Sequence, residues 1–436
     1  MSDPAIAVEI ARGLDPEFAF LSLFAEKRHA FWLDAGPDAP RGWSWMGEGT
    51  PEDPRQVRAT TCAPPPHADE HGSPFRGGWV GWAGYDAAAR RVGAPAVDDD
   101  LAPPEAWLRA EAVLAFDHVT GRAWAIGPRD AAHRLAEATA DVRTPDPVAE
   151  PAVPASVVAR HRPDEYAALI EECRAAIREG DAYQLCLTTR FSVSGAVDPV
   201  EAYRRLRSLT PSHHGGFIRV GEVALLSASP ERFLEVVPGE GAARVRTSPI
   251  KGTRPRGRTR EEDAALATEL RDSEKERAEN VMIVDLMRND LSRVCRAGTV
   301  GVDALLEVES YPAVHQLVST VSGELEAETT VDDLLDAAFP AGSMTGAPKL
   351  SAMTILHRLE RGPRGVFSGC FGWIGSDGAL DLAMVIRSIV VHPGGAYVGA
   401  GGGITWRSEA AAEVAEVGVK ARGPLGALGA ALPPGW

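Results

Sequence analysis

The lysine at position 251 is surrounded by residues that suit chemistry on an anion. It lies in the segment SPIKGTRPRG, residues 248–257, between a proline turn and a pair of arginines. A neutral lysine amine is a nucleophile, and a protonated one is a point charge for carboxylates. The segment therefore predicts an anionic substrate and leaves both roles of Lys251 open.

Two pairs of glutamates have the spacing that places them on one face of a helix. Glu276 and Glu279 stand three residues apart, and Glu413 and Glu416 repeat that spacing, with Lys420 one turn further on. Carboxylates at this spacing repel each other unless a cation neutralises them. Their hard oxygens suit Mg²⁺ with some waters retained. Two exposed helix faces rich in glutamate are the alternative.

Three further features suit the binding of an anion. Residues 398–404 read VGAGGGI, and we expect a loop here, between a strand and the last helix, in which backbone N–H groups approach an anion. Arg387 closes an expected strand and can pair with a carboxylate through two nitrogens, although a surface arginine is the alternative. His315 is ambiguous by itself.

The elements that position these residues lie on both sides of a proline-rich linker at 143–156, where we place a boundary. Residues 1–142 contain short aromatic runs at 30–33, 78–82 and 122–126, which predict a sheet-rich N-terminal region. Residues 157–425 mix expected helices at 164–179, 260–293 and 408–422 with expected strands at 184–193, 223–228, 367–372 and 381–391. The predicted class is α+β with antiparallel sheet.

Composition limits the kinds of partner that the chain can have. The formal charge of the 436 residues is −16, which argues against nucleic acid or an anionic membrane as the main partner. The five cysteines are scattered without a CxxC pair, and no leader or membrane span is expected. We therefore expect reduced thiols and a cytoplasmic location.

Taken together, these strings are similar to those of the chorismate-utilising enzyme family. The motifs that carry the resemblance are GDAYQ (180–184), ASPERF (228–233), PIKGTRPRG (249–257), ENVMIVDLMRND (279–290), VHQLVS (314–319), FPAGSMTGAPK (339–349) and GAGGGI (399–404). The resemblance covers roughly residues 155–425. It implies two antiparallel sheets packed as a sandwich, with helices outside and the site in a cleft.

The resemblance also implies roles for individual residues. Mg²⁺ would be held by Glu279 and Glu416, with Glu276 and Glu413 supporting through water, and would bind the ring carboxylate of chorismate. Arg387, Gly401 and Lys420 would contact the carboxylates of the substrate, and Gly252, Thr253 and His315 would line the pocket. Glu231 would be the general acid that protonates the departing C4 hydroxyl.

Two positions distinguish the reactions of this family. Members that add water carry a lysine base where this chain has Gln184, which cannot take up a proton, so water addition is disfavoured. Enzymes that place nitrogen at C2, giving anthranilate, usually have alanine where this chain has Lys251. Lysine is typical of enzymes that place nitrogen at C4, because an amine can attack C2 first and be displaced when ammonia attacks C4.

The resemblance therefore implies synthesis of 4-amino-4-deoxychorismate for p-aminobenzoate and folate, and anthranilate synthesis is the alternative. The sequence shows no Gly-x-Cys-x-Gly elbow, so we expect a separate glutamine amidotransferase subunit to supply the ammonia. A non-catalytic binding protein is a third interpretation. The complete set of Glu231, Lys251, Glu279 and Glu416 argues against it.

Overall fold

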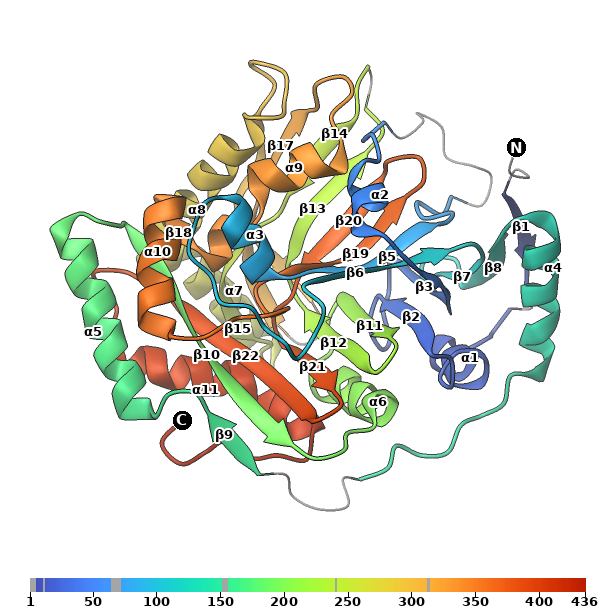
Figure 1. The fold of residues 1–436 in the computed structure, drawn as a ribbon, viewed down its shortest axis with the longest axis horizontal. Coiled ribbons are helices and arrows are strands. Elements are labelled where there is room, and N and C mark those ends of the chain that lie inside the picture. The colour runs from blue at the N-terminus through green and yellow to red at the C-terminus, as the bar shows by residue number, and fades with distance from the viewer. Residues whose placement is uncertain (1–4, 11, 64–71, 151–155, 240, 312–313) are drawn as a thin grey trace.

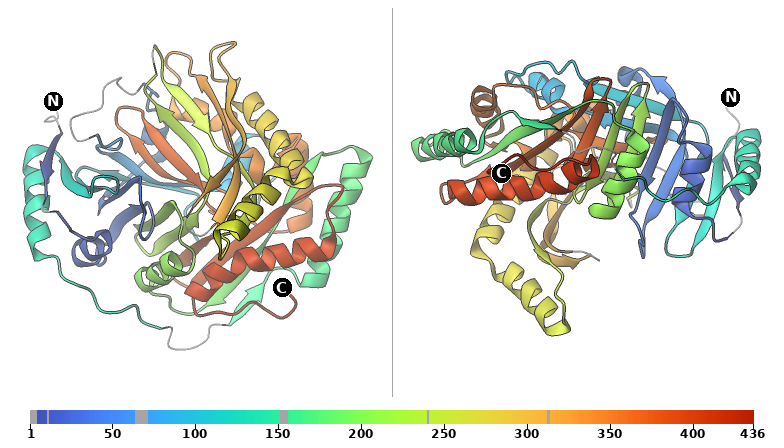
Figure 2. Two further views of the ribbon diagram at one scale, coloured as in Figure 1. Left: turned by 180° about the vertical axis from the view of Figure 1, so that it is seen from behind. Right: turned by 90° about the horizontal axis from the view of Figure 1, so that it is seen from below.

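Two large antiparallel sheets, lying face to face, form the centre of the molecule (Figure 1). The computed structural model describes residues 5–10, 12–63, 72–150, 156–239, 241–311 and 314–436. Every strand pairing within these ranges is antiparallel, and helices cover the outside (Figure 2). The predicted α+β sandwich is therefore confirmed.

Both sheets combine strands from before and after the proline-rich segment. The 12-stranded sheet has the order β1 (Ile6–Glu9), β8 (Arg122–Gly127), β7 (Val113–Asp117), β3 (Trp43–Glu48), β2 (His29–Asp34), β11 (His214–Val220), β12 (Val223–Ser229), β21 (Ser388–His392), β22 (Gly395–Ile404), β10 (Gln184–Ser194) and β18 (Gly346–Ala347), with β9 (Val157–Ala159) also on β10. The 10-stranded sheet has the order β15 (Ile250–Pro255), β17 (Val314–Glu324), β14 (Arg244–Thr247), β13 (Arg232–Val237), β20 (Leu380–Met384), β19 (Cys370–Gly375), β5 (Gly78–Ala83), β6 (Glu105–Ala110) and β4 (Thr50–Glu52), with β16 (Gly301–Ser310) on β17.

The helices are distributed along the whole chain. They are α1 (Pro16–Leu23), α2 (Pro54–Arg58), α3 (Tyr85–Arg91), α4 (Arg129–Ala138), α5 (Pro163–Glu179), α6 (Pro199–Leu209), α7 (Arg260–Asp272), α8 (Glu274–Leu291), α9 (Val331–Ala338), α10 (Lys349–Glu360) and α11 (Ala410–Ala427), with 3₁₀ turns η1 (Thr139–Asp141) and η2 (Gly342–Met344). Within the described ranges, none of these helices has the length and apolar character needed to cross a membrane.

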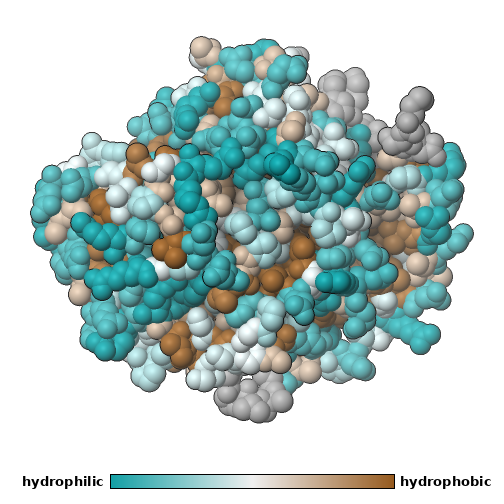
Figure 3. Space-filling view, viewed as in Figure 1, coloured by the Kyte–Doolittle hydropathy of each residue, from teal (hydrophilic) through white to brown (hydrophobic). Residues whose placement is uncertain are grey.

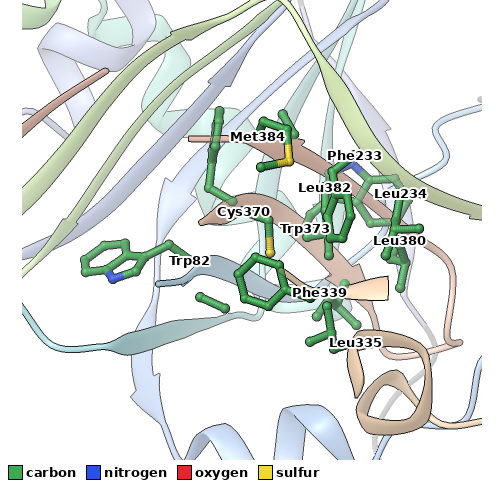
Figure 4. Packing of buried hydrophobic residues seen from close by; sticks show 14 of the residues in the cluster. Trp82, Phe233, Leu234, Leu335, Phe339, Cys370, Trp373, Leu380, Leu382 and Met384 are labelled. Carbon is green, nitrogen blue, oxygen red and sulfur yellow. The ribbon is translucent and has the colours of Figure 1, made fainter. Parts of the chain in front are cut away.

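The core has two layers because the 12-stranded sheet is buried on both faces. On β2, Phe31 faces the cluster between the sheets, whereas its neighbour Trp32 faces the cluster under the helices. This alternation is the period-two pattern of a strand. Figure 4 shows part of the cluster that contains Phe31. Phe233 of β13 lies near Leu335 and Phe339 from α9 and its C-terminal end, so this cluster also extends under a helix. Burial of this surface supplies the main driving force for folding.

The surface matches the acidic composition. The face in Figure 3 is mostly hydrophilic, and its apolar side chains form small separate groups. All five cysteines are free and buried.

The elements predicted from the sequence are confirmed at several positions. The expected aromatic strands correspond to β2, β5 and β8, and the expected helix at 164–179 corresponds to α5, with Pro163 in its first turn. The other elements confirmed are β10 and β12. Of the expected linker 143–156, residues 151–155 lie outside the described part of the chain.

Five predicted elements need correction. The expected helix at 260–293 is two helices, because Ser273 adopts an extended conformation and caps α8. The expected strand at 381–391 is broken into β20 and β21 at Arg387, whose φ is +52°. The expected strand at 367–372 begins only at Cys370, and residues 399–403 lie inside β22 rather than in a loop. Finally, α11 continues to Ala427, beyond the predicted end at 422.

Candidate active site

Lys251 sits on a β-bulge at the edge of the 10-stranded sheet. Its strand β15 pairs with β17 through Ile250 and Val318, and then through Thr253 and Gln316, so one extra residue is inserted between these pairs. Gly252 provides the turn with a φ of +81°. Bulges of this kind redirect a side chain next to a functional site. Here the amine of Lys251, whose side chain is 14% exposed, is placed 3.9 Å from Oε2 of Glu279.

The glycines of β22 form the wall opposite Lys251. A Cβ atom on Gly403 would lie 2.7 Å from Nε2 of Gln184 and 3.2 Å from Nζ of Lys251. The absence of a side chain at Gly403 therefore leaves room for the amide of Gln184 and the amine of Lys251. Both polar atoms of the Gln184 side chain are buried without a hydrogen-bond partner among the described residues. A buried amide without a protein partner is suited to hydrogen-bond a polar ligand.

The two predicted carboxylate pairs come from helices α8 and α11. Between them lies Lys275, whose amine is 4.0 Å from Oε1 of Glu279 and 3.7 Å from Oε1 of Glu413. Burial lowers the pKa of Lys275, but the surrounding carboxylates, Glu413 first, raise it on balance. Both helices therefore present their glutamates to one cation.

The pKa values of Glu279 and Glu416 shift in opposite directions. Burial raises the pKa of Glu279, and the charge of Lys251 opposes that rise. Burial also acts to raise the pKa of Glu416, but Lys420 at 2.7 Å outweighs it and the pKa is lowered. Glu276 forms an ion pair with Arg254, in which Oε1 of Glu276 lies 3.8 Å from Nη1 of Arg254. The helix pair therefore carries four carboxylates whose charges are only partly balanced.

The carboxylates are suitable for Mg²⁺ in their chemistry but are not gathered into a cage. Within the described residues, no three acidic, histidine or cysteine side chains approach closely enough to form a metal site. However, Oε1 of Glu279 is buried without a hydrogen-bond partner in the described part of the chain. Carboxylate oxygens, with waters completing the shell, are the ligands that Mg²⁺ prefers. In their chemistry, these carboxylates therefore fit a magnesium ion.

Glu231 is a buried carboxyl next to the same space. It is 7% exposed, lies between β12 and β13, and its backbone carbonyl accepts a hydrogen bond from the backbone N–H of Met384. Burial raises its pKa to about 7, although a hydrogen bond with Ser343 and the charges of Lys251 and Lys420 act in the opposite direction. A carboxyl that holds its proton near neutral pH can act as a general acid.

Lys420 and Gly401, which were both predicted to contact the substrate, lie in direct contact. The amine of Lys420 donates a 2.8 Å hydrogen bond to the carbonyl of Gly401, across the gap between α11 and β22. A Cβ atom on the neighbouring Gly402 would lie 3.2 Å from Oε2 of Glu413 and 3.8 Å from the amine of Lys420. The glycine run therefore allows α11 to approach the strand closely, as Figure 2 shows.

Arg387 lies in the break between β20 and β21. Its guanidinium makes no hydrogen bond or ion pair with another residue in the described ranges, although burial lowers its pKa, opposed by Glu416. Arg387 is partly buried, and a cation in such a place without a side-chain partner can pair with an anionic ligand. This arginine is therefore suited to the carboxylate of a ligand.

Two predicted pocket residues are placed differently from the others. Thr253 is exposed on β15. His315 is buried on β17, with Nδ1 2.8 Å from Oγ of Ser310 and Nε2 2.9 Å from Oδ1 of Asp263, so both ring nitrogens are engaged. Their contact with a substrate stays a prediction.

A cavity of about 600 Å³ is lined by Trp45, Tyr311 and Trp373 together with sequence neighbours of two site residues. Arg232 follows Glu231, and Ile250 precedes Lys251. None of the predicted site residues itself lines this cavity.

Sequence reasoning missed Ser343 and Lys275. The spacing of Lys275 and Glu279, four residues apart on one helix, is a signal that predicts their contact. For Ser343 no local signal exists, because η2 and Glu231 meet only in the folded chain.

Comparisons with known proteins are consistent with this geometry. The sequence profile described as chorismate binding enzyme matches residues 29–426. An aminodeoxychorismate synthase of Streptomyces pristinaespiralis is 40% identical over 96% of this chain, which spans 64% of that protein. Anthranilate synthase component 1 of Thermus thermophilus is 42% identical over 81% of this chain and 78% of that protein.

A solved structure shares the fold. Anthranilate synthase component I from Streptococcus pneumoniae superposes with a TM-score of 0.74 and 30% identity, covering 97% of this chain and 92% of that one. The chain spans less than two thirds of the length of the Streptomyces relative.

Proposed function

This chain belongs to the chorismate-binding enzyme family, and we propose that it acts as aminodeoxychorismate synthase component I, converting chorismate and ammonia to 4-amino-4-deoxychorismate for p-aminobenzoate and folate synthesis. The observation that carries the proposal is the position of Lys251. A bulge directs its amine into a largely buried site, 3.9 Å from Glu279 and opposite Gly403.

Substrate binding uses the cations and the helix pair. Arg387 and Lys420 bind the carboxylates of chorismate, with the backbone of Gly401 beside them. Glu279 and Glu416 would hold Mg²⁺, with Glu276 and Glu413 supporting through water. When bound, the metal neutralises these carboxylates and attracts the ring carboxylate of the substrate. This explains how a chain with a net charge of −16 binds a dianion.

The reaction then proceeds through two allylic displacements. The neutral amine of Lys251 attacks C2, the ring double bond shifts, and the C4–O bond breaks. Glu231 donates its proton to the departing oxygen, which leaves as water. Ammonia next attacks C4, the double bond shifts back, and the C2–N bond breaks with its electron pair returning to Lys251. The product ammonium returns a proton to Glu231 through solvent.

Gln184 supports amination rather than hydration. Its side chain faces the same space as Lys251 but cannot take a proton from water. The alternative product is anthranilate. The 42% identity to anthranilate synthase component 1 of Thermus thermophilus supports this alternative.

The nitrogen source is a separate glutamine amidotransferase subunit. Glutaminase chemistry of the cysteine type needs a reactive thiolate. Burial raises the pKa of Cys62, Cys295 and Cys370 to about 12, so these thiols stay protonated. The buried and unpaired cysteines also support a reducing, cytoplasmic location. The purified chain is expected to use ammonium but not glutamine, and turnover of glutamine by the chain alone would contradict this part of the proposal.

Mass spectrometry of the products tests the reaction. Chorismate, Mg²⁺ and ammonium at raised pH are incubated with the native chain or with Lys251→Ala. We expect 4-amino-4-deoxychorismate from the native chain, and its loss or diversion to anthranilate in the variant. Anthranilate from the native chain would assign the protein to tryptophan synthesis.

A further inference from the structure

A buried arginine, Arg364, joins two segments that carry site residues. The guanidinium of Arg364 donates a 2.6 Å hydrogen bond to the carbonyl of Met344 in η2 and a 2.8 Å bond to the carbonyl of Cys186 in β10. Met344 follows Ser343, which bonds Glu231, and Cys186 lies two residues after Gln184.

All five N–H donors of Arg364 have acceptors. The remaining bonds reach Oε2 of Glu360 at 2.8 Å, Oε1 of Glu360 at 2.6 Å and the hydroxyl of Ser368 at 3.4 Å. The side chain is 1% exposed, and Tyr85 lies against its guanidinium at 4.3 Å. Glu360 extends the network, because its Oε1 also accepts the N–H of Thr188 on β10 at 2.9 Å. A buried charge that is fully bonded in this way fixes the relative position of the groups it contacts.

The loop between η2 and α10 has a second anchor at its other end. Lys349 donates a 2.8 Å hydrogen bond to Asp290 on α8, and Cys186 donates a 2.8 Å backbone bond to Thr345. Lysine can make a point contact of this kind, but it cannot reproduce the planar fork of arginine. The side chain of Arg364 bonds both η2 and β10, and it adds to the bond between Cys186 and Thr345 and to the pairing of β18 with β10 just beyond η2.

We propose that Arg364 is a positioning residue for the general acid: it holds η2 against β10 so that the hydroxyl of Ser343 meets the carboxyl of Glu231. The proposal rests on the proposed function, in which Glu231 protonates the leaving hydroxyl. The groups that act electrostatically on Glu231 are Lys251 from β15 and Lys420 from α11, together with the hydroxyl from η2. Arg364 touches none of these charges, so it acts through Ser343.

The test compares pH profiles of chorismate consumption for the native chain, Ser343→Ala, Arg364→Lys and the double variant. Loss of the hydroxyl removes a bond that favours the ionised carboxylate, so Glu231 keeps its proton to higher pH. We expect the basic limb of kcat to move up by about one pH unit in Ser343→Ala. Arg364→Lys should reproduce that shift with little change in KM for chorismate, and the double variant should shift no further than either single one.

The matched control is Arg190→Lys. Arg190 is also a buried arginine on β10, paired with Asp99 at 2.7 Å and stacked on Tyr397, but its side chain makes no bond to η2. Its profile should stay at the native position. If Arg364→Lys does not fold, Glu360→Gln, which loosens the same arginine, carries the same expectation.

Two results would overturn the proposal. One is a native profile in the folded Arg364 or Glu360 variant, and the other is a shift in the double variant equal to the sum of two independent shifts. Because chorismate consumption is measured, the result does not depend on which amine is formed. The identity of the product tests the proposed function separately.

Discussion

At the scale of single residues, Glu231 is the side chain whose surroundings are most clearly set for chemistry rather than for stability. Its burial raises its pKa to about 7 from the ordinary 4.5. The folded protein therefore keeps this proton at pH values where an unfolded chain has lost it. The folded state loses stability as the pH rises from 4.5 to 7, and the loss stays in place above that range.

Replacing Glu231 by glutamine separates these two effects. The amide cannot donate a proton to the leaving oxygen, so kcat should fall by about 10²- to 10⁴-fold. At pH 8 the free energy of unfolding of the variant should exceed that of the native chain by up to about 3 kcal/mol. The variant should therefore unfold at a higher temperature. Steady-state kinetics and thermal unfolding at pH 5 and pH 8 check both expectations. A variant less stable than the native chain at pH 8 would show that folding does not raise the pKa of this carboxyl.

At the scale of elements, the bulge in β15 determines where Lys251 points. Gly252 has a φ of +81°, and a Cβ atom there would lie 2.7 Å from Cδ1 of Leu270 and 3.0 Å from Cγ of Glu276. The glycine therefore allows both the turn and the close approach of α7 and α8. Gly298 has almost the same φ, +82°, with nothing within 4 Å.

The pair Gly252→Ala and Gly298→Ala isolates the effect of the close approach. Both variants should lose about 1 kcal/mol from the left-handed backbone conformation. Only Gly252→Ala should lose more stability than that and also most of its activity, because α8 must move away from Lys251. Denaturant unfolding and chorismate turnover measure the difference. Equal losses in the two variants would show that α7 and α8 adjust freely around an added methyl group.

Elements were predictable where the sequence signal is local. The apolar and aromatic run of β2 and the proline in the first turn of α5 identify those elements from sequence alone. The break at Ser273 was not predictable, because both flanking segments have helical composition and only the capping bond to Glu276 ends the run.

The site residues also divide into those with a local sequence signal and those recognised only in the folded structure. Lys251, Glu231 and the two glutamate pairs were found through motifs and spacing. The roles of Ser343 and Arg364 depend on contacts between segments far apart in sequence. The glycines of β22 were expected in a loop, since their sequence does not reveal that the side chains of Gln184, Lys251 and Glu413 occupy the space beside the strand.

At the scale of the whole molecule, the net charge of −16 favours cations everywhere on the surface, so binding of Mg²⁺ at the helix pair has to be separated from this general attraction. Lys275→Met removes the cation that lies between Glu279 and Glu413. We expect Mg²⁺ to bind roughly tenfold more tightly to this variant by calorimetry, because an unfavourable charge within a few ångströms is gone. Lys27→Met, which breaks a surface pair with Glu48, changes the net charge equally and should leave the affinity unchanged. Equal changes in both variants would indicate diffuse binding.

The interleaving of the two sheets has a consequence for how the chain is made. Strand β5 pairs with β19 through Ala83 and Cys370, and β2 pairs with β11. At roughly 5–20 residues per second, the ribosome needs on the order of tens of seconds to deliver the partner of β5. Until then the nascent polypeptide exposes an unpaired strand containing Trp82, whose side chain is fully buried in the finished protein. Neither sheet can be completed until strands β19 to β22, in the final quarter of the chain, have been synthesised. The early strands therefore stay without their partners for most of synthesis and must be kept from aggregating during that time.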